Sequence, residues 1–162
     1  MRTFIGLAVL VLVGSQPGGA QALTDAQRDE IEAGVRAQLE RTYTAVTSLD
    51  ESMFSWAVSE QDGVCVFDKT METCDVLWDA MKYAWGTIEK DGVARTEIEG
   101  MEIKVVALSP TVAVAAVTMA ENRAYNEAGG VNATTIAALW VYVLEDGEWR
   151  VHSGQSASWP IQ

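Results

Sequence analysis

The sequence predicts an α+β domain, with three helices in its first half and a sheet of long antiparallel strands in its second half. Between residues 24 and 85, apolar side chains recur at three- or four-residue spacing, which is the period of a helix packed on one side. Between residues 95 and 158, valine, alanine, threonine and aromatic residues dominate, with turn signals at intervals. Helices grouped before strands are typical of the α+β class.

The first helix is expected to begin just after Thr24. Thr24 and Gln27 have capping-box spacing, so each side chain can satisfy a free backbone amide at the helix start. A single apolar stripe follows, with charged and amide residues on the other faces. Its members are Ile31, Val35, Leu39, Tyr43 and Val46. This pattern predicts one long amphipathic helix.

Two shorter helices are expected before the sheet. Asp50 can cap a helix over residues 53–57. Residues 64–67 form a short strand-like run, and Thr70 and Thr73 are both possible caps for a third helix. The face of that third helix carries Cys74, Leu77, Trp78, Met81 and Trp85, and Gly86 ends it.

Runs of β-forming residues predict four strands, over residues 98–108, 111–125, 131–144 and 149–158. Gly100 interrupts the alternation of the first of these strands, as a β-bulge would. Asp146 and Gly147 form a hairpin signal of the Asp-Gly type between the last two. We therefore expect antiparallel neighbours joined by turns.

Residues 1–22 have the features of a cleavable secretory signal peptide. Arg2 gives a positive start, residues 4–13 form an apolar run, and Ala20-Gln21-Ala22 fits a signal peptidase site. The run is too short to cross a bilayer, which takes about 20 apolar residues. An uncleaved anchor is the alternative. We expect one mature domain over residues 23–162, periplasmic or secreted, with no membrane association after cleavage.

The charge of the chain makes two classes of partner poor candidates. The formal net charge is −12, and loss of Arg2 with the signal peptide makes it −13 because no other charged residue precedes Leu23. Such a surface repels phosphate backbones and anionic lipids. We therefore expect neither nucleic acid nor a membrane surface as a partner.

The two cysteines, Cys65 and Cys74, are predicted to form a disulfide in an oxidising compartment. Two reduced, buried thiols are the alternative. His152 is the only histidine, and the spacings that typify zinc sites are missing from the sequence. We expect no metal and no cofactor.

The closing stretch, residues 146–156, begins with Asp-Gly-Glu-Trp-Arg-Val and continues with His152 and Ser153. Together with the order of helices and strands, it resembles the SnoaL-like and nuclear transport factor 2-like superfamily, whose relatives include ketosteroid isomerases. The resemblance covers residues 24–160. It implies a strongly curved sheet wrapped around the helices, a cone-shaped α+β barrel with an apolar pocket at its open end, and frequent pairing into homodimers.

The chain departs from the enzymes of that superfamily in two ways. The isomerase base and its proton-donating partners have no matching positions, and the closing stretch holds one histidine where many relatives hold two or three. No catalytic residue is therefore carried over from the resemblance. Asp68, which follows a strand and precedes a helix, is the one carboxylate we name as a possible base, with a helix or turn cap as the alternative reading.

Five residues are expected to share the pocket, with ordinary core packing as the alternative for the aromatic ones: Tyr43, Trp78, Asn122, Trp140 and Ser153. A buried tyrosine can donate to a ligand carbonyl, and tryptophan rings can line a cavity for a flat molecule. Strand alternation lets only one of Glu121 and Asn122 face inward, and we favour Asn122. The same alternation places Ser153 and Gln155 inward if Trp149 and Val151 are inward.

Three functions remain open at this stage. The leading hypothesis is an exported domain that binds a small, mostly apolar molecule in the cone. The second is an isomerase- or cyclase-like enzyme that uses Asp68 or Tyr43 for proton transfer next to a carbonyl. The third is a non-catalytic domain that dimerises and fills its own cone.

A homodimer is expected because one alternating set of side chains on residues 131–144 is apolar and would face outward: Ala137, Leu139, Val141 and Val143.

Overall fold

The computed structural model describes residues 22–48, 50–67, 70–79, 93–125 and 131–161. Its helices are α1 (Asp25–Thr47) and α2 (Met53–Trp56). Its strands are β1 (Val64–Phe67), β2 (Thr70–Thr73), β3 (Val93–Ser109), β4 (Val112–Tyr125), β5 (Val131–Glu145) and β6 (Glu148–Pro160). The predicted α+β class is confirmed. Of the predicted signal peptide, only Ala22 lies within the described residues, so the leader and its cleavage stay predictions.

The described strands form one curved, unclosed sheet of six strands in the order β2-β1-β6-β5-β4-β3. The long strands β3 to β6 form antiparallel pairs with their sequence neighbours, as predicted. The sequence predicted a strand over residues 64–67 but no partner for it; β1 runs parallel to β6, with Cys65 opposite Gly154. No local signal in so short a strand reveals a partner about 90 residues away in the chain.

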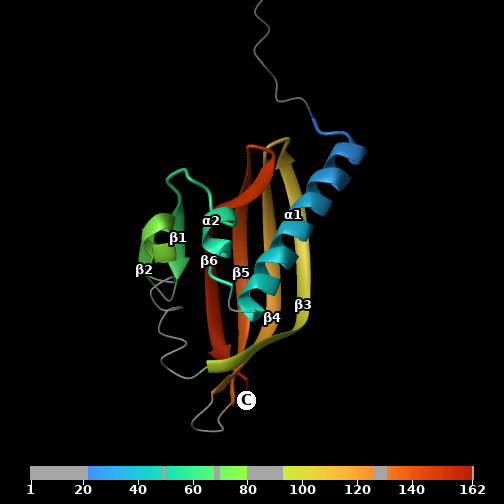
Figure 1. The fold of residues 1–162 in the computed structure, drawn as a ribbon. Helices are drawn as coiled ribbons and strands as arrows, with labels where there is room; N and C mark the ends of the chain where they lie inside the picture. The colour runs from blue at the N-terminus through green and yellow to red at the C-terminus, as the bar shows by residue number, and fades with distance from the viewer. Residues whose placement is uncertain (1–21, 49, 68–69, 80–92, 126–130, 162) are drawn as a thin grey trace, which may run out of the picture.

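Helix α1 crosses one face of the sheet (Figure 1). The predicted capping box is confirmed, since Thr24 accepts from the Gln27 amide and the Gln27 side chain accepts from the Thr24 amide. The stripe buries Ile31, Val35 and Leu39 against the sheet. Gly34 brings α1 close to β6, because a Cβ there would lie 2.9 Å from Nε1 of Trp149. Trp149 is partly buried and packs against the hydrophobic core.

Side chains of α1 also cover the free edge of β3. Arg36 donates to the carbonyl oxygen of Ile103 at 3.0 Å, and the amide of Ala107 donates to the carboxylate of Glu32 at 3.5 Å. Backbone groups on an edge strand otherwise invite pairing with another chain. The long helix therefore both buries one face of the sheet and protects one of its edges.

Of the two short helices, the first differs from expectation in its start and the second begins as expected. Asp50 does not occupy the N-cap of α2; Ser52 does, and the Asp50 carboxylate accepts the Ser52 amide at 2.9 Å. Residues 74–79 are helical, and Thr73 accepts the Val76 amide at 3.4 Å, as expected of a cap. The rest of the third helix lies outside the described residues, so three helices are not confirmed. Thr70 belongs to strand β2, which the sequence analysis missed.

Two turn predictions are confirmed. Gly100 has φ +60° beside a register shift between Glu99 and Glu102, which is the predicted bulge in β3. Asp146 has φ 50° and Gly147 has φ 84°, as a two-residue hairpin turn of the primed type requires.

The predicted disulfide between Cys65 and Cys74 is present, with a Cα–Cα distance of 5.0 Å. It joins β1 to the start of the helical residues 74–79 and is buried in the core. Gly63 is needed beside it, because a Cβ there would lie 1.6 Å from the carbonyl oxygen of His152. The disulfide thus fixes the segment that carries Leu77 and Trp78.

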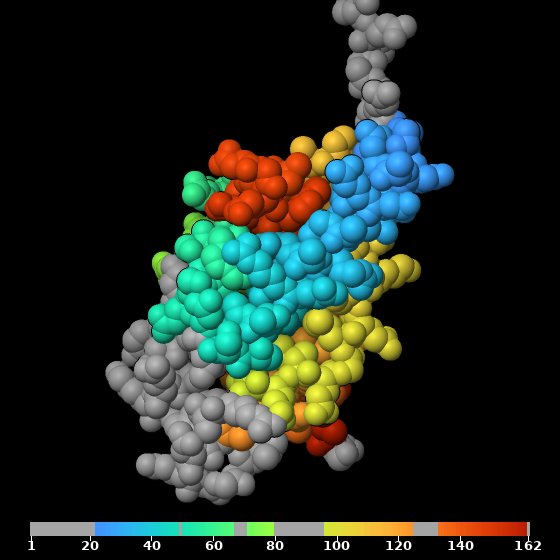
Figure 2. All heavy atoms as spheres, turned by 45° about the vertical axis from the view of Figure 1, so that its right-hand side comes forward, coloured from blue at the N-terminus to red at the C-terminus, as the bar shows by residue number. Residues whose placement is uncertain are grey.

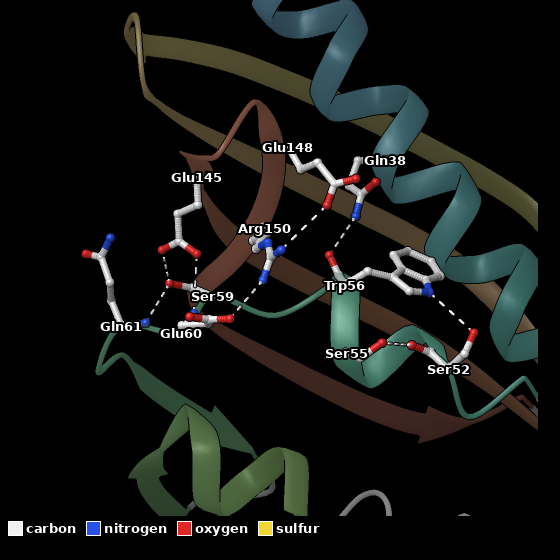
Figure 3. A network of polar contacts seen from close by, with 10 residues as sticks. All are labelled: Gln38, Ser52, Ser55, Trp56, Ser59, Glu60, Gln61, Glu145, Glu148 and Arg150. Carbon is white, nitrogen blue, oxygen red and sulfur yellow. Dashed lines mark hydrogen bonds and ion pairs between the residues drawn. The ribbon is translucent and has the colours of Figure 1, made fainter.

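A polar network anchors the segment after α2 to the β5–β6 hairpin (Figure 3). Ser59 donates its hydroxyl to the Glu145 carboxylate, which also accepts the Glu60 amide at 3.3 Å. Arg150 forms ion pairs with Glu60 at 3.8 Å and with Glu148 at 3.6 Å. The same segment is held to Val151 by two backbone hydrogen bonds of 2.8 Å: the Ser59 amide donates to the Val151 carbonyl oxygen, and the Val151 amide donates to the Ala57 carbonyl oxygen.

Within the described ranges, no helix is long and apolar enough to cross a membrane.

Candidate functional site

A cavity of about 360 Å³ lies between α1 and the sheet. Figure 2 shows α1 and α2 lying side by side over this part of the molecule. The cavity is walled by Leu39 and Val46 of α1, by Met53 of α2, and by inward residues of β3 to β6. Its volume falls in the range of about 300–1,000 Å³ that small-molecule sites occupy. Most of its surface is apolar.

Alternation along the strands places every second side chain of β4 and β5 on the face of the sheet that lines the cavity. Ile136, Trp140 and Tyr142 of β5 line the cavity, as the sequence predicts. Across the strand pair, Ala115 lies opposite Trp140 and Ala113 opposite Tyr142. Both alanines are fully buried, so small side chains on β4 make room for the large rings of β5.

Trp78 and Trp140 together form an aromatic wall. Their ring centroids are 6.4 Å apart and their planes differ by 29°. Phe54 packs edge-on against Trp78, with centroids 5.8 Å apart. Gly154 lies beneath Trp140, because a Cβ there would be 2.2 Å from the ring. The predicted pocket roles of Trp78 and Trp140 therefore agree with their positions.

Tyr43 also lines the cavity, as predicted, and its hydroxyl is hydrogen-bonded to Trp140. An indole N–H can only donate, so Trp140 donates to the Tyr43 oxygen. Burial raises the pKa of Tyr43 to about 12, the bond from Trp140 lowers it, and the negative charge of Glu121 raises it further. Burial likewise raises the pKa of Tyr142, with a smaller contribution from Tyr43. Both phenols keep their protons at neutral pH.

Glu121, not Asn122, faces the cavity, so our preference between these neighbours was wrong. The inward set on β4 consists of odd-numbered residues, and it ends with Glu121, of which 7% is exposed, and Arg123. Arg123 donates to the Glu121 carboxylate at 3.1 Å. Asn122 pairs with Glu97 and Ala133 on the other face of the sheet and does not line the cavity. Hydropathy favours the neutral amide, but the ion pair makes burial of the carboxylate possible.

Ser153 does not line the cavity either, because a β-bulge reverses the alternation of β6. Val141 pairs with Ser153 and Tyr142 with Val151, which leaves His152 as an extra residue. An extra residue moves every later side chain to the opposite face. Ser156 and Ser158 therefore line the cavity, whereas Gln155 lies on the outer face. Ser153 accepts the Val64 amide at 3.1 Å and contacts His152 at 2.8 Å.

The candidate base Asp68 lies outside the described residues, so its role stays a prediction. Among the residues that the structure does describe, no three histidine, cysteine, aspartate or glutamate side chains gather as they would around a metal ion. Sequence reasoning weighed Glu121 but did not choose it, and it missed further polar residues of the lining, among them Arg123, Thr134, Ser156 and Ser158. Glu121 and Arg123 carried a usable signal, since charged residues two apart in an apolar strand occupy the same face.

Several solved structures share this architecture. A hexachlorocyclohexane dehydrochlorinase (LinA) of type 2 superposes with a TM-score of 0.67 at 10% identity, over 86% of this chain and 94% of that one. A putative scytalone dehydratase from Novosphingobium aromaticivorans gives 0.67 at 12% identity, over 83% and 89%. A nuclear transport factor 2-like superfamily protein from Salmonella enterica gives 0.60 at 14% identity, over 86% and 95%.

The chain has the nuclear transport factor 2-like fold. This confirms the resemblance seen in the closing stretch and the order of elements. Searches of protein-family models and of curated proteins returned no match. At 10–14% identity, the likeness to these structures is one of fold alone.

In this nuclear transport factor 2-like domain, the chemistry available at the cavity is limited. The walls offer aromatic faces, the indole N–H of Trp78, one ion pair and the hydroxyls of Tyr43, Tyr142, Thr134, Ser156 and Ser158. The Glu121 carboxylate is engaged by Arg123, and the Thr42 hydroxyl donates back to the Gln38 carbonyl at 2.9 Å. Such a site can orient a mostly apolar molecule through a few polar contacts.

Proposed function

We propose that this domain binds a small, mostly apolar molecule in the cavity between α1 and the sheet. The observation that carries the proposal is an apolar cavity of about 360 Å³ whose polar lining groups are few. A cone filled by its own side chains would offer no such space, so the purely structural alternative loses its support. Sites with this composition bury most of a small ligand and fix its orientation with a few hydrogen bonds.

A specific observation favours a second candidate, an enzyme that moves a proton next to a carbonyl. Glu121 places a buried carboxylate in the same wall as Tyr43, whose pKa its charge raises. A carboxylate base beside a hydroxyl donor is what such chemistry needs. The ion pair with Arg123 argues for binding instead, because the arginine already occupies the carboxylate that a base would need to keep available. Solved structures of this fold include proteins named as a dehydrochlorinase and a dehydratase, so both candidates are tested below.

The proposal includes export and self-association. Residues 1–22 would be removed, and the mature domain would work in the periplasm or outside the cell; the buried disulfide supports an oxidising compartment. Two copies would pair through the outer face of the sheet. The support there is a shallow groove lined by Val66, Ala116, Ala137, Leu139 and Ala157.

Native mass spectrometry of the protein recovered from its own host tests the proposal. We expect a retained small molecule at one per protomer. Ser158→Leu should lose it, because Ser158 lines the cavity and not the outer groove, and the larger side chain would occupy the space. Ser55→Leu makes the same change at an exposed position of α2 and should keep it. Retention by both variants would place the molecule elsewhere.

A further inference from the structure

The cavity wall holds a buried hydrogen-bond donor that the rest of the described chain leaves without a partner. Trp78 is 7% exposed, and its Nε1 has no hydrogen-bond acceptor among the residues described. The indole nitrogen can donate but cannot accept. Native proteins rarely leave such a donor unpaired, so a bound molecule is our candidate for the acceptor that the described residues do not supply.

Arg123 adds a second donor to the same wall. One terminal nitrogen of its guanidinium donates to Glu121, whereas its buried Nε finds no acceptor within the described ranges. Arg123 and Trp78 both line the cavity. The Glu121 carboxylate, which is the strongest acceptor in the wall, is already used by the arginine.

Tyr43 brings a hydroxyl that can donate to an acceptor in the cavity. Other hydroxyls of the lining, like that of Tyr43, can donate or accept; they include those of Tyr142, Thr134, Ser156 and Ser158. Trp78 Nε1 and Arg123 Nε can only donate, so these two groups decide the balance.

Building on the proposed function, we infer that the ligand is a flat, uncharged molecule whose oxygens only accept hydrogen bonds, such as an aromatic ketone, a quinone or an ester. The near-parallel rings of Trp78 and Trp140 suit a flat apolar body. Two buried groups that can only donate, Trp78 Nε1 and Arg123 Nε, call for acceptors on the ligand. An anion is disfavoured, because Arg123 is already neutralised and a ligand carboxylate would be repelled by Glu121.

Calorimetric titration of the mature domain with three probes of one size tests this inference: 2-acetylnaphthalene, 2-ethylnaphthalene and 2-naphthoate. We expect the ketone to bind at least about tenfold more tightly than the hydrocarbon, a difference of about 1.4 kcal/mol. The carboxylate should bind more weakly than the ketone. In Trp78→Phe and in Tyr43→Phe, the preference for the ketone should fall below about threefold. Trp159→Phe, a change at a residue that is 48% exposed, should retain the full preference.

The outcomes separate this inference from the proposed function. Equal affinity for ketone and hydrocarbon would overturn the acceptor requirement and leave a binding cavity in place. Tighter binding of the carboxylate would overturn the requirement for a neutral ligand. If none of the three probes binds, the proposed cavity function fails together with the inference. Should Trp78→Phe not fold, Tyr43→Phe still decides, because it removes a single oxygen atom.

Discussion

Glu121 and Arg123, two residues apart on β4, form an ion pair of 3.1 Å in the wall of the cavity, with the glutamate side chain only 9% exposed. Their spacing in a strand places both side chains on the inner face. Burial of the carboxylate depends on the arginine, because an unpaired buried charge is costly. The pair is therefore the main fixed charge at the site.

Removal of one partner should show this dependence. Arg123→Met should lower the free energy of unfolding by about 1–3 kcal/mol, because Glu121 loses its charged donor. The double variant Arg123→Met with Glu121→Gln should recover part of this loss. Urea unfolding of the mature domain provides the measurement. A double variant no more stable than the single one would show that the carboxylate is not the source of the loss.

The same glutamate separates binding from catalysis. Glu121→Gln should leave the affinity for a retained ligand within about tenfold, or about 1.4 kcal/mol, if the domain only binds it. For an enzyme that uses Glu121 as its base, the same variant should abolish turnover of that molecule. The comparison needs the ligand identified by native mass spectrometry. Asp68→Asn is the matching test for the candidate base named from the sequence.

Tyr43 predicts a loss of stability at alkaline pH. Its pKa in the folded state is about 12 against an ordinary value of 10.0, because burial disfavours the phenolate. The contribution of Tyr43 to the free energy of unfolding is constant below about pH 10. It falls as the pH rises from 10 to about 12, because the tyrosine of the unfolded chain ionises first. The loss from this group should reach about 2–3 kcal/mol.

Tyr43→Phe should remove this part of the alkaline loss and keep the part that comes from buried Tyr142. It should also cost about 1–3 kcal/mol at neutral pH, because the Trp140 donor loses its acceptor. Free energies of unfolding measured at pH 8 and at alkaline pH give both the cost of the substitution and the alkaline loss. Trp159→Phe serves as the control, with an unchanged pH profile. An equal alkaline loss in wild type and Tyr43→Phe would contradict the assignment.

Gly154 should tolerate no side chain. A Cβ at this position would lie 2.2 Å from the Trp140 ring and 2.7 Å from the Leu139 carbonyl oxygen, and the backbone oxygen cannot give way cheaply. Gly154→Ala should therefore cost about 1–3 kcal/mol of stability and weaken ligand binding by displacing Trp140. Ala157→Ser, an exposed change on the same strand, should do neither. Normal stability and affinity in Gly154→Ala would contradict the position of the Trp140 ring.

The outer face of the sheet should mediate a homodimer. Leu139 is 41% exposed there, in the groove that also holds Ala116 and Ala137. Leu139→Glu should give a monomer, whereas Met71→Glu on β2, at a residue 73% exposed, should not change the mass. Multi-angle light scattering at micromolar concentration measures both. A wild-type monomer would rule out the interface.

Local signals in the sequence were sufficient for much of this fold. The capping box at Thr24, the Asp-Gly turn at residue 146 and the bulge at Gly100 each depend on neighbouring residues, and each is present. The parallel partner of β1 and the bulge at His152 depend on pairing between distant strands. One extra residue in β6 was enough to replace Ser153 by Ser156 and Ser158 in the cavity.

Residues that line the cavity could be predicted where the alternation of inward and outward side chains along a strand is not interrupted by a bulge. Trp140 lies on such a set in β5 and was placed correctly. The choice of Asn122 over Glu121 failed because hydropathy ranks single residues, whereas burial of a charge depends on its partner. That partner, Arg123, stands two positions further along the strand.

Nuclear magnetic resonance of the indole N–H groups tests the central claim most directly. The mature domain would be titrated with 2-acetylnaphthalene, with the Trp78 signal assigned by its loss in Trp78→Phe. The account predicts that the Trp78 N–H resonance moves downfield as a hydrogen bond forms, while the exposed Trp159 resonance stays in place. Binding that leaves Trp78 unchanged and shifts backbone signals of Leu139 and Ala157 on the outer face would contradict a ligand site between α1 and the sheet.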